Sequence, residues 1–313
     1  MGSIRWGRAV VICAALTLAA GSGVVAARLA GPGRALESST PGSAPTTSSQ
    51  PSLAPSAPAG GPATATPSGP IATADPMATA ARTVVQSNLY KAGRLPASRC
   101  KEPAARATSP AKVRLYYTQF LACLNKSWAP VIRKAGFTFS APKLVVYAGR
   151  QADLPCDLTS TAVYCDGTIY MSADYDLKNH ASYDPLWTRT TMAFLIAHEY
   201  GHHVQSLAGI LQASHLREST LSNSNLALLE HRRRELQASC LSGVYLGADK
   251  QYFPARGSWL LKWRWTVRNR GDEWNPQRTH GNKTSHSRWS RAGFDAADPA
   301  ACNTFTAEPA TVS

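Results

Sequence analysis

The stretch AHEYGHHVQ, residues 197–205, places two histidines and a glutamate at spacings that suit metal chemistry. Residues four positions apart project from the same face of an α-helix, so His198 and His202 can bind one zinc ion through their imidazole nitrogens. Glu199 is rotated by about 100° from His198, which places its carboxylate beside the open position of such a metal. There it can take a proton from a reacting water molecule. The spacing therefore indicates hydrolytic zinc chemistry, with Glu199 as the catalytic base.

A solvated cluster of histidines is the alternative interpretation of this motif. The apolar run MAFLIA, residues 192–197, leads directly into it and indicates a helix that is buried in the core. Burial of two histidines and a glutamate without partners would cost several kcal/mol, so a metal site is favoured. We expect this helix over residues 188–210, with Thr188 as its cap and with Pro185 ending the segment before it.

Two histidines and a water molecule leave a tetrahedral zinc site one protein ligand short. A third histidine further along the motif is excluded, because Gln205 and Ala208 stand where Gly and His would be needed. The remaining candidates are acids downstream, namely Glu218, Glu230 and Glu235.

These three acids differ in their surroundings. Glu218 lies in a polar stretch without a clear helical phase. Glu230 stands four residues before Arg234, which is typical of a solvated helix face. Glu235 lies close to an apolar stripe in a helix that we expect over residues 226–247. Glu235 is therefore the favoured third ligand.

Periodicity and turn signals predict the other elements. An apolar stripe with spacings of three and four predicts a helix with a kink or a restart at Pro130, and Asp166-Gly167 predicts a tight hairpin turn. We expect an α+β fold in which a small sheet with a hairpin packs against the motif helix and against a second helix that bears the third ligand. The expected elements are helices over 112–135, 188–210, 226–247 and near 258–268, a strand over 143–149, a hairpin over 162–171 and an unwound stretch over 211–224.

Six of the seven cysteines lie after residue 75, and the seventh, Cys13, lies in an apolar segment near the N-terminus. An even number of cysteines in an exported domain favours three disulfides, and the absence of a CxxC pair argues against a second metal site. Cys156 and Cys165 flank the start of the predicted hairpin and could staple it. The candidates for disulfides are Cys100, Cys123, Cys156, Cys165, Cys240 and Cys302.

The N-terminal quarter of the chain predicts export rather than a folded domain. Arg5 and Arg8 precede an uncharged apolar run, residues 9–27, which is typical of an export signal or of a single membrane anchor. The next stretch consists almost entirely of Pro, Ser, Thr, Ala and Gly, and it predicts a disordered linker. The expected organisation is an export signal or anchor over 1–36, a linker over 37–75 and one folded domain over 76–313. We expect a single-pass protein of the cell membrane with an exported C-terminal domain, or a secreted protein after signal cleavage.

The net charge of +14 indicates anionic partners. For an exported domain, these would be cell-envelope polymers or lipid headgroups, with the membrane also contacted through the N-terminal segment if that segment is not cleaved. Export makes nucleic acid an unlikely partner. The tryptophans between residues 258 and 291 are interleaved with basic residues, and we expect them to be core contacts with the basic residues on the solvent side.

HEYGHHVQ followed by ELQASC, residues 235–240, resembles the neutral zinc metallopeptidase family of bacterial exported and membrane-anchored proteins, whose motifs are HEYGHHVQ and ELQADC. The family is similar to the gluzincins, in which a glutamate on a second helix completes the zinc site. The resemblance thus implies Glu235 as the third ligand. Ser239 stands where the family has an aspartate that supports a histidine ligand, so we expect zinc binding to survive and turnover to be reduced. The resemblance extends over NLYKAGRLP (88–96), LACLNKSWAPV (121–131), THG (279–281) and RAGFDAADPAACNTF (291–305).

The same resemblance gives His280, in THG, a role as donor to the oxyanion of the reaction, because the family carries HG at this point. His203 faces away from the metal stripe, and we expect it to form hydrogen bonds within the fold.

The expected activity is zinc-dependent hydrolysis of a peptide or protein outside the cytoplasmic membrane. The alternative is a protein that binds zinc, has weak or no activity, and attaches to the envelope through its basic surface. The remaining histidines, His180, His215, His231 and His286, are expected on the surface.

Overall fold

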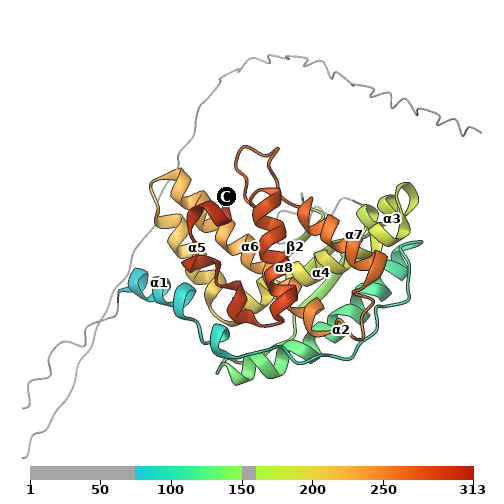
Figure 1. Cartoon of the computed structure of the whole chain (residues 1–313), viewed down its shortest axis with the longest axis horizontal. Coiled ribbons are helices and arrows are strands. Elements are labelled where there is room, and N and C mark those ends of the chain that lie inside the picture. Colours follow the sequence, from blue (N-terminus) through green and yellow to red (C-terminus); the bar gives the residue numbers. More distant parts are fainter. Residues whose placement is uncertain (1–74, 150–159) are drawn as a thin grey trace, which may run out of the picture. The chain divides into compact units, whose positions relative to one another are not determined.

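The computed structural model describes residues 75–149 and 160–313 of the chain. Helices make up most of this part, together with a sheet of three strands (Figure 1). The expected α+β class is confirmed. The helices are α1 Pro76–Gln86, α2 Pro110–Lys134, α3 Ala173–Ser182, α4 Pro185–Leu207, α5 Ile210–Thr220, α6 Ser224–Ala248, α7 Gly257–Arg268 and α8 Lys283–Ala296, the short 3-10 helices are η1 Asn88–Lys91, η2 Pro299–Cys302, η3 Thr304–Thr306 and η4 Pro309–Val312, and the strands are β1 Lys143–Tyr147, β2 Ala162–Cys165 and β3 Thr168–Ser172.

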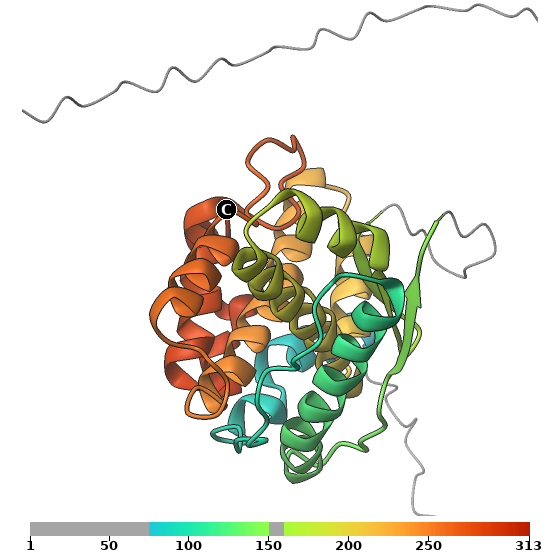
Figure 2. The ribbon, with the colours of Figure 1, turned by 90° about the vertical axis from the view of Figure 1, so that its right-hand side faces the viewer.

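The sheet has the strand order β1-β3-β2. β1 pairs with β3 in parallel, and β2 pairs with β3 as the predicted antiparallel hairpin. Asp166 and Gly167 at its turn have φ angles of 48° and 74°, the left-handed conformation that a two-residue hairpin loop of this sequence requires. Figure 2 shows the sheet along one side of the domain and the C-terminal helices along the other, with β2 and β3 in contact with α4.

The helix that carries the HEYGH motif, α4, begins one turn earlier than predicted. Asp184 caps it by accepting a hydrogen bond from the backbone N–H of Leu186, and Pro185 is its first residue. The predicted roles of Pro185 as a terminator and of Thr188 as the cap are therefore wrong. The reason is that the fixed φ and missing N–H of proline suit the first position of a helix as well as they suit a stop.

Close backbone packing joins α6 to α4 and to α8. A Cβ added at Gly201 of α4 would lie 2.6 Å from the carbonyl oxygen of Ala238 on α6. One added at Gly243 of α6 would lie 2.1 Å from the carbonyl oxygen of Ser290 on α8. Only glycine allows these approaches, so the two helices that supply the motif residues and Glu235 are held at a fixed, short separation.

Two predictions about helices need correction. The stretch 211–224 is largely helical, because α5 covers most of it and follows α4 after Gly209, which has a φ of 72°. Ion pairs between the side chains of α5 and α6 hold this polar helix in place, and such pairs leave no trace in the hydrophobic periodicity. α2 continues through Pro130 as one helix, without the restart that we considered.

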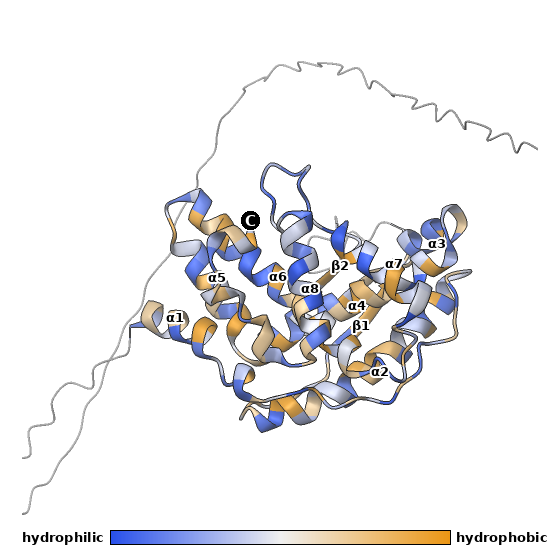
Figure 3. Ribbon diagram, viewed as in Figure 1, coloured by the Kyte–Doolittle hydropathy of each residue, from blue (hydrophilic) through white to orange (hydrophobic). Residues whose placement is uncertain are grey.

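The hydrophobic core gathers between α2, α4, α6 and the sheet. Figure 3 shows hydrophobic stretches along α2, α4 and β1. Along α4 the side chains from Thr190 to Gln205 are all buried, including the apolar run that leads into the motif. The prediction of a core helix is thus confirmed. It also means that the polar residues of the motif lie in surroundings where they need partners.

The disulfide prediction is confirmed for the cysteines that the structure describes. Cys100 is joined to Cys123, and Cys240 is joined to Cys302. Cys165 is also disulfide-bonded, while Cys156, its predicted partner, lies outside the described residues. The N-terminal apolar segment and the linker lie outside them as well. Among the helices of the described ranges, none is long and apolar enough to cross a membrane.

Candidate metal centre

Three imidazole nitrogens converge on one carboxylate oxygen. His198 and His202 come from one face of α4, Glu235 comes from α6, and His280 comes from the loop between α7 and α8. Oε2 of Glu235 lies 3.4 Å from Nε2 of His198 and 3.1 Å from Nε2 of His202. The same oxygen lies 3.4 Å from Nε2 of His280. The structure thus brings together all of these residues that the sequence analysis selected.

The spacing of these atoms fits zinc. Zinc forms bonds of about 2.0–2.1 Å to nitrogen and oxygen, and in a tetrahedron this places neighbouring ligand atoms about 3.3–3.4 Å apart. The distances from Oε2 of Glu235 to the three nitrogens lie between 3.1 and 3.4 Å. The group of ligand atoms that lie within 4.8 Å of one another consists of His198, Glu235 and His280 and does not include His202. Neutral imidazole and carboxylate form a donor set that zinc prefers, so the residues fit this metal.

Gln205 fixes the orientation of the His202 ring. Its Nε2 donates hydrogen bonds to the carbonyl oxygen of Arg234 and to Oε1 of Gln237. Its Oε1 therefore faces Nδ1 of His202, at 2.9 Å, and accepts the proton that this nitrogen carries. Nε2 of His202 therefore faces Oε2 of Glu235, at 3.1 Å, and offers a lone pair to a metal ion once its own proton has left. This role of Gln205 was not predicted from the sequence, although Gln205 is the last residue of HEYGHHVQ.

Ser239 lies beside Nδ1 of His198 in the same way that Gln205 lies beside Nδ1 of His202. Its Oγ lies 3.0 Å from Nδ1 of His198 and 2.9 Å from Nε2 of His286, which is on α8. Nδ1 of His286 in turn contacts the carbonyl oxygen of Val267. The prediction that His286 lies on the surface is wrong, because it is only 1 % exposed. Its contacts join α8 to α6 and α7, and no local sequence pattern indicates such contacts.

The two rejected acids have structural partners. Glu218 is bonded to Arg234 and to His231, and Glu230 is bonded to Arg217. The prediction that Glu230 occupies a solvated face with Arg234 is wrong, since Glu230 is buried. Both acids join α5 to α6, and neither has an oxygen directed at the histidines of the motif.

Burial and mutual contacts determine the ionisation of the motif residues. Burial raises the pKa of Glu199 to about 7. Burial also lowers the pKa of His198 to about 4 and acts in the same direction on His202, but the neighbouring Glu235 carboxylate outweighs it there and raises the pKa of His202 to about 9. For Glu235, burial acts to raise the pKa, but the neighbouring His202 and His198 imidazoles hold it well below its usual range. The cluster therefore has a permanent anion at its centre, with a second carboxyl that can exchange a proton near neutral pH.

His280 is held by Asp272, which sequence analysis also missed. Oδ2 of Asp272 accepts hydrogen bonds from the backbone N–H of His280 and from Oγ1 of Thr279, and it lies 3.5 Å from Nδ1 of His280. Burial acts to lower the pKa of His280, but Asp272 and Glu235 reverse this effect and raise it. The His280 side chain is 43 % exposed, so it can reach a molecule in the cavity as well as the cluster.

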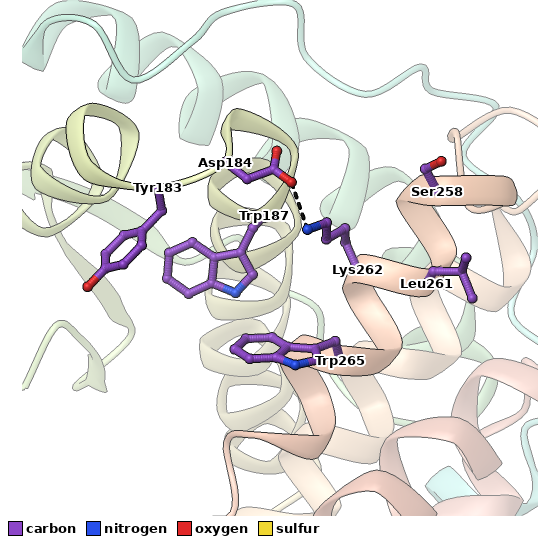
Figure 4. Close-up of a pocket in the computed structure, with 7 residues that line it drawn as sticks. All are labelled: Tyr183, Asp184, Trp187, Ser258, Leu261, Lys262 and Trp265. Carbon is purple, nitrogen blue, oxygen red and sulfur yellow. Dashed lines mark ion pairs between the residues drawn. The ribbon is translucent and has the colours of Figure 1, made fainter. Parts of the chain in front are cut away.

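A cavity of about 420 Å³ opens onto this cluster. A larger hollow of about 700 Å³ lies where the start of α4 meets α7, and Figure 4 shows the aromatic rings of Tyr183, Trp187 and Trp265 along it. The charged groups that line this hollow, Asp184 and Lys262, form an ion pair at 2.7 Å and so neutralise each other. His198 and Glu199 of the motif line the smaller cavity instead. Its lining includes Phe194, Leu195, His198, Glu199, Arg270, Asp272, Trp274 and His280.

Among the other histidines that the sequence analysis considered, His231 also faces Glu235, with its Nε2 3.7 Å from Oε1. His203 is buried and bonded to the hydroxyl of Tyr164 and to the carbonyl oxygen of Ser140, as expected. His215 is exposed, whereas His180 and His231 are partly buried.

Of the five tryptophans in the C-terminal region, two are buried, two are exposed, and Trp289 is partly buried against the core. Trp259 and Trp263 are buried core residues, as predicted. Trp265 and Trp274 are 54 % and 85 % exposed, so the same prediction is wrong for them. Apolar character alone does not decide burial in a helix such as α7, which has one face on the core and one in solvent.

Comparison with known proteins supports the interpretation of the site. The family model described as "Putative neutral zinc metallopeptidase" matches residues 79–255, which include the cluster residues of α4 and α6 but not the loop that carries His280. "Uncharacterized protein YpfJ" of Escherichia coli K12 is 29 % identical over 224 residues, which cover 66 % of this chain and 76 % of that protein. "Uncharacterized protein Rv2575" of Mycobacterium tuberculosis H37Rv is 27 % identical over 209 residues, which cover 58 % of this chain and 66 % of that protein. No solved structure matches the chain.

Proposed function

Because the chain belongs to the neutral zinc metallopeptidase family, we propose that it is a zinc-dependent peptidase that cleaves peptide bonds in a peptide or protein substrate. The observation that carries the proposal is the convergence of Nε2 of His198 and Nε2 of His202 on Oε2 of Glu235, beside the buried carboxyl of Glu199. In this proposal the two histidines and Glu235 hold the zinc ion. When bound, zinc supplies a Lewis acid that polarises the scissile carbonyl and lowers the pKa of a water molecule.

Glu199 is the catalytic base in this proposal. It follows His198 directly on α4 and lines the same cavity. A carboxyl whose pKa is raised to about 7 by burial can accept a proton from the attacking water near neutral pH and can return it to the leaving amine. Because Glu199 is only 6 % exposed, this exchange takes place away from bulk solvent.

His280 is the proposed donor to the oxyanion of the tetrahedral intermediate. Asp272 faces its Nδ1, so Nε2 is the nitrogen that is directed at the cluster. The raised pKa of His280 favours a proton on that nitrogen, which is what a hydrogen bond to a developing negative charge requires. The exposed part of the ring allows it to contact a substrate in the cavity.

We propose that the protein acts outside the cytoplasmic membrane. The apolar run over residues 9–27 and the Pro-rich stretch that follows it support export, and so do the disulfides Cys100–Cys123 and Cys240–Cys302, which form in oxidising compartments. The net charge of +14 supports anionic envelope polymers or lipid headgroups as further partners.

A zinc-binding protein without useful activity is the alternative, and the serine at position 239 motivates it. The geometry favours the active form, because Ser239 still reaches His198 at 3.0 Å and satisfies its Nδ1. A hydroxyl carries no charge, so the proposal includes a lower turnover than an aspartate at this position would give.

The test compares wild-type protein with Glu199→Gln on a mixed peptide library, with zinc per chain measured on the same samples. We expect both to bind one zinc ion and only the wild type to hydrolyse peptides, with a loss of about 100-fold or more in the variant. Glu308→Gln, which makes the same chemical change in an exposed residue at the C-terminus, is the matched control and should keep full activity. Equal and negligible hydrolysis by the wild type and Glu199→Gln, with zinc bound to both, would select the inactive alternative.

A further inference from the structure

A chain of hydrogen bonds runs from the proposed ligand His198 through Ser239 to His286 and ends on the backbone. Nδ1 of His198 lies 3.0 Å from Oγ of Ser239, and this oxygen lies 2.9 Å from Nε2 of His286. Nδ1 of His286 contacts the carbonyl oxygen of Val267. The three side chains are buried and come from three helices, α4, α6 and α8.

Only one arrangement of protons satisfies this chain. A carbonyl oxygen can only accept, so Nδ1 of His286 carries a proton and donates it to Val267. In a neutral ring Nε2 of His286 is then an acceptor, and the Ser239 hydroxyl donates its single proton to it. The Ser239 oxygen is left to accept from Nδ1–H of His198. Nε2 of His198 therefore holds a lone pair directed at Glu235.

A charged His286 would reverse this order, but its surroundings disfavour that state. The histidine ion pairs of the described residues involve His198, His202, His231 and His280 but not His286, and His286 is 1 % exposed. An imidazolium buried in this way, without a counter-charge, would be costly. The Phe194 ring lies 5.5 Å from the ring of His286 and 5.6 Å from that of His198, so apolar surface covers both.

We propose that His286 is a positioning residue for the metal centre, which acts through Ser239 to fix the tautomer and the orientation of His198. The inference rests on the proposed zinc site. Without His286, the Ser239 hydroxyl is free to rotate and can donate to Nδ1 of His198, which stabilises the tautomer that cannot bind metal through Nε2. With His286 in place, the Ser239 hydroxyl donates to Nε2 of His286 and therefore cannot donate to His198.

The fold holds His286 at the distance that this role needs. A Cβ added at Gly293 of α8 would lie 2.0 Å from the carbonyl oxygen of Cys240, which adjoins Ser239 on α6. Together with the close approach at Gly243, this contact fixes α8 against α6 on the C-terminal side of His286. On its N-terminal side, Asn282 caps α8 through the backbone N–H of Ser285.

The serine and the histidine form a matched pair. An aspartate at position 239 would accept from Nδ1–H of His198 directly and would need no help from His286. It would, however, turn its acceptor oxygens toward the lone pair on Nε2 of His286. The effects of substitutions at positions 239 and 286 on zinc affinity should therefore be non-additive. Such coupling distinguishes a positioning role of His286 from a role in packing alone.

The experiment is a double-mutant cycle on zinc affinity, measured on the full chain by competition with a chelator. His286→Ala should weaken zinc binding about 10-fold or more, which is typical for loss of a partner of a ligand histidine. Ser239→Asp in the His286→Ala background should restore most of this affinity. The matched control is His203→Ala, because His203 is also a buried histidine but lies on α4 and bonds to Tyr164 and Ser140. This variant should lower stability and leave zinc affinity unchanged.

Nitrogen-15 NMR of the histidine rings gives a readout that needs no variant. We expect protons on Nδ1 of both His198 and His286 in the zinc-bound wild type. A proton on Nε2 of His286, or equal zinc affinity of His286→Ala and wild type, would overturn the inference, and so would Ser239→Asp failing to rescue His286→Ala. Failure of the proposed zinc site itself would look different, because the wild type would then bind no zinc at all.

Discussion

Glu235 is the residue on which the proposed zinc site depends most, because its Oε2 faces all three imidazole nitrogens of the cluster. We predict that Glu235→Gln weakens zinc binding by more than about 100-fold, since loss of a ligand should exceed the loss typical of a ligand's partner. Glu230→Gln is the control, because Glu230 is also a buried glutamate of α6 but pairs with Arg217. It should lower stability and keep zinc. Full zinc affinity in Glu235→Gln would rule out this ligand.

His280 allows a prediction that separates catalysis from metal binding. As an oxyanion donor it should be dispensable for zinc, so His280→Ala should keep zinc affinity while kcat falls by about 10²–10³-fold. Chelator competition and steady-state kinetics on the same preparation give both quantities. A large loss of zinc affinity would instead make His280 a metal ligand, as its 3.4 Å distance to Glu235 permits.

The residues of the site differ in how far the sequence reveals them. The roles of His198, Glu199 and His202 follow from spacing along one helix, which a sequence shows directly. Glu235 required the choice of one acid among three, which its place beside an apolar helix stripe and then the ELQASC motif supplied. Gln205 follows His202 at helical spacing and was within reach of the same rule, whereas Asp272 and His286 act through contacts that only the folded chain makes.

At the scale of elements, the approach of α4 to α6 sets the geometry of the cluster. A Cβ at Gly201 would lie 2.6 Å from the backbone oxygen of Ala238. Gly201→Ala should therefore push the helices apart, lower the free energy of unfolding by about 1–3 kcal/mol and weaken zinc binding, because Gly201 adjoins His202. Urea denaturation and chelator competition measure the two effects.

Gly247→Ala is the control for this prediction. Its added Cβ would lie 2.0 Å from the backbone oxygen of Phe294, at the far end of α6 from Glu235. It should cost a comparable amount of stability with little change in zinc affinity. If Gly201→Ala and Gly247→Ala weaken zinc binding equally, the spacing of α4 and α6 does not determine the geometry of the zinc site.

The errors made about elements have a common physical cause. Proline at position 185 is compatible with both a helix start and a stop, and only the capping contact of Asp184 decides between them. α5 has little apolar periodicity, and its ion pairs with α6 stabilise it instead. The hairpin and the core helix were predictable because turn chemistry and a continuous apolar run are local signals.

For the molecule as a whole, the buried carboxyl of Asp176 predicts a pH dependence of stability. It accepts a hydrogen bond from Tyr117, and burial raises its pKa from 3.8 to about 7. The folded protein therefore binds this proton more tightly than the unfolded chain does. The stability that it contributes is complete below pH 3.8 and is lost as the pH rises through about 7, by at most about 4 kcal/mol.

Asp176→Asn tests this dependence, because an amide cannot ionise. Relative to wild type, the variant should gain stability steadily between pH 4 and pH 7 and should stay ahead at pH 8. Urea denaturation of both proteins across this range measures the difference in the free energy of unfolding. A difference that does not change with pH would show that Asp176 is not protonated in the fold.

The central claim, that one zinc ion held by His198, His202 and Glu235 works with Glu199 to cleave peptides, is tested most directly by titrating zinc into metal-free full-length protein. The account predicts that peptide hydrolysis rises in proportion to added zinc and stops rising at one ion per chain. It also predicts that Glu199→Gln takes up the same single ion and stays inactive. Hydrolysis that is independent of added zinc, or that is equal in the wild type and in Glu199→Gln at one ion per chain, would contradict it.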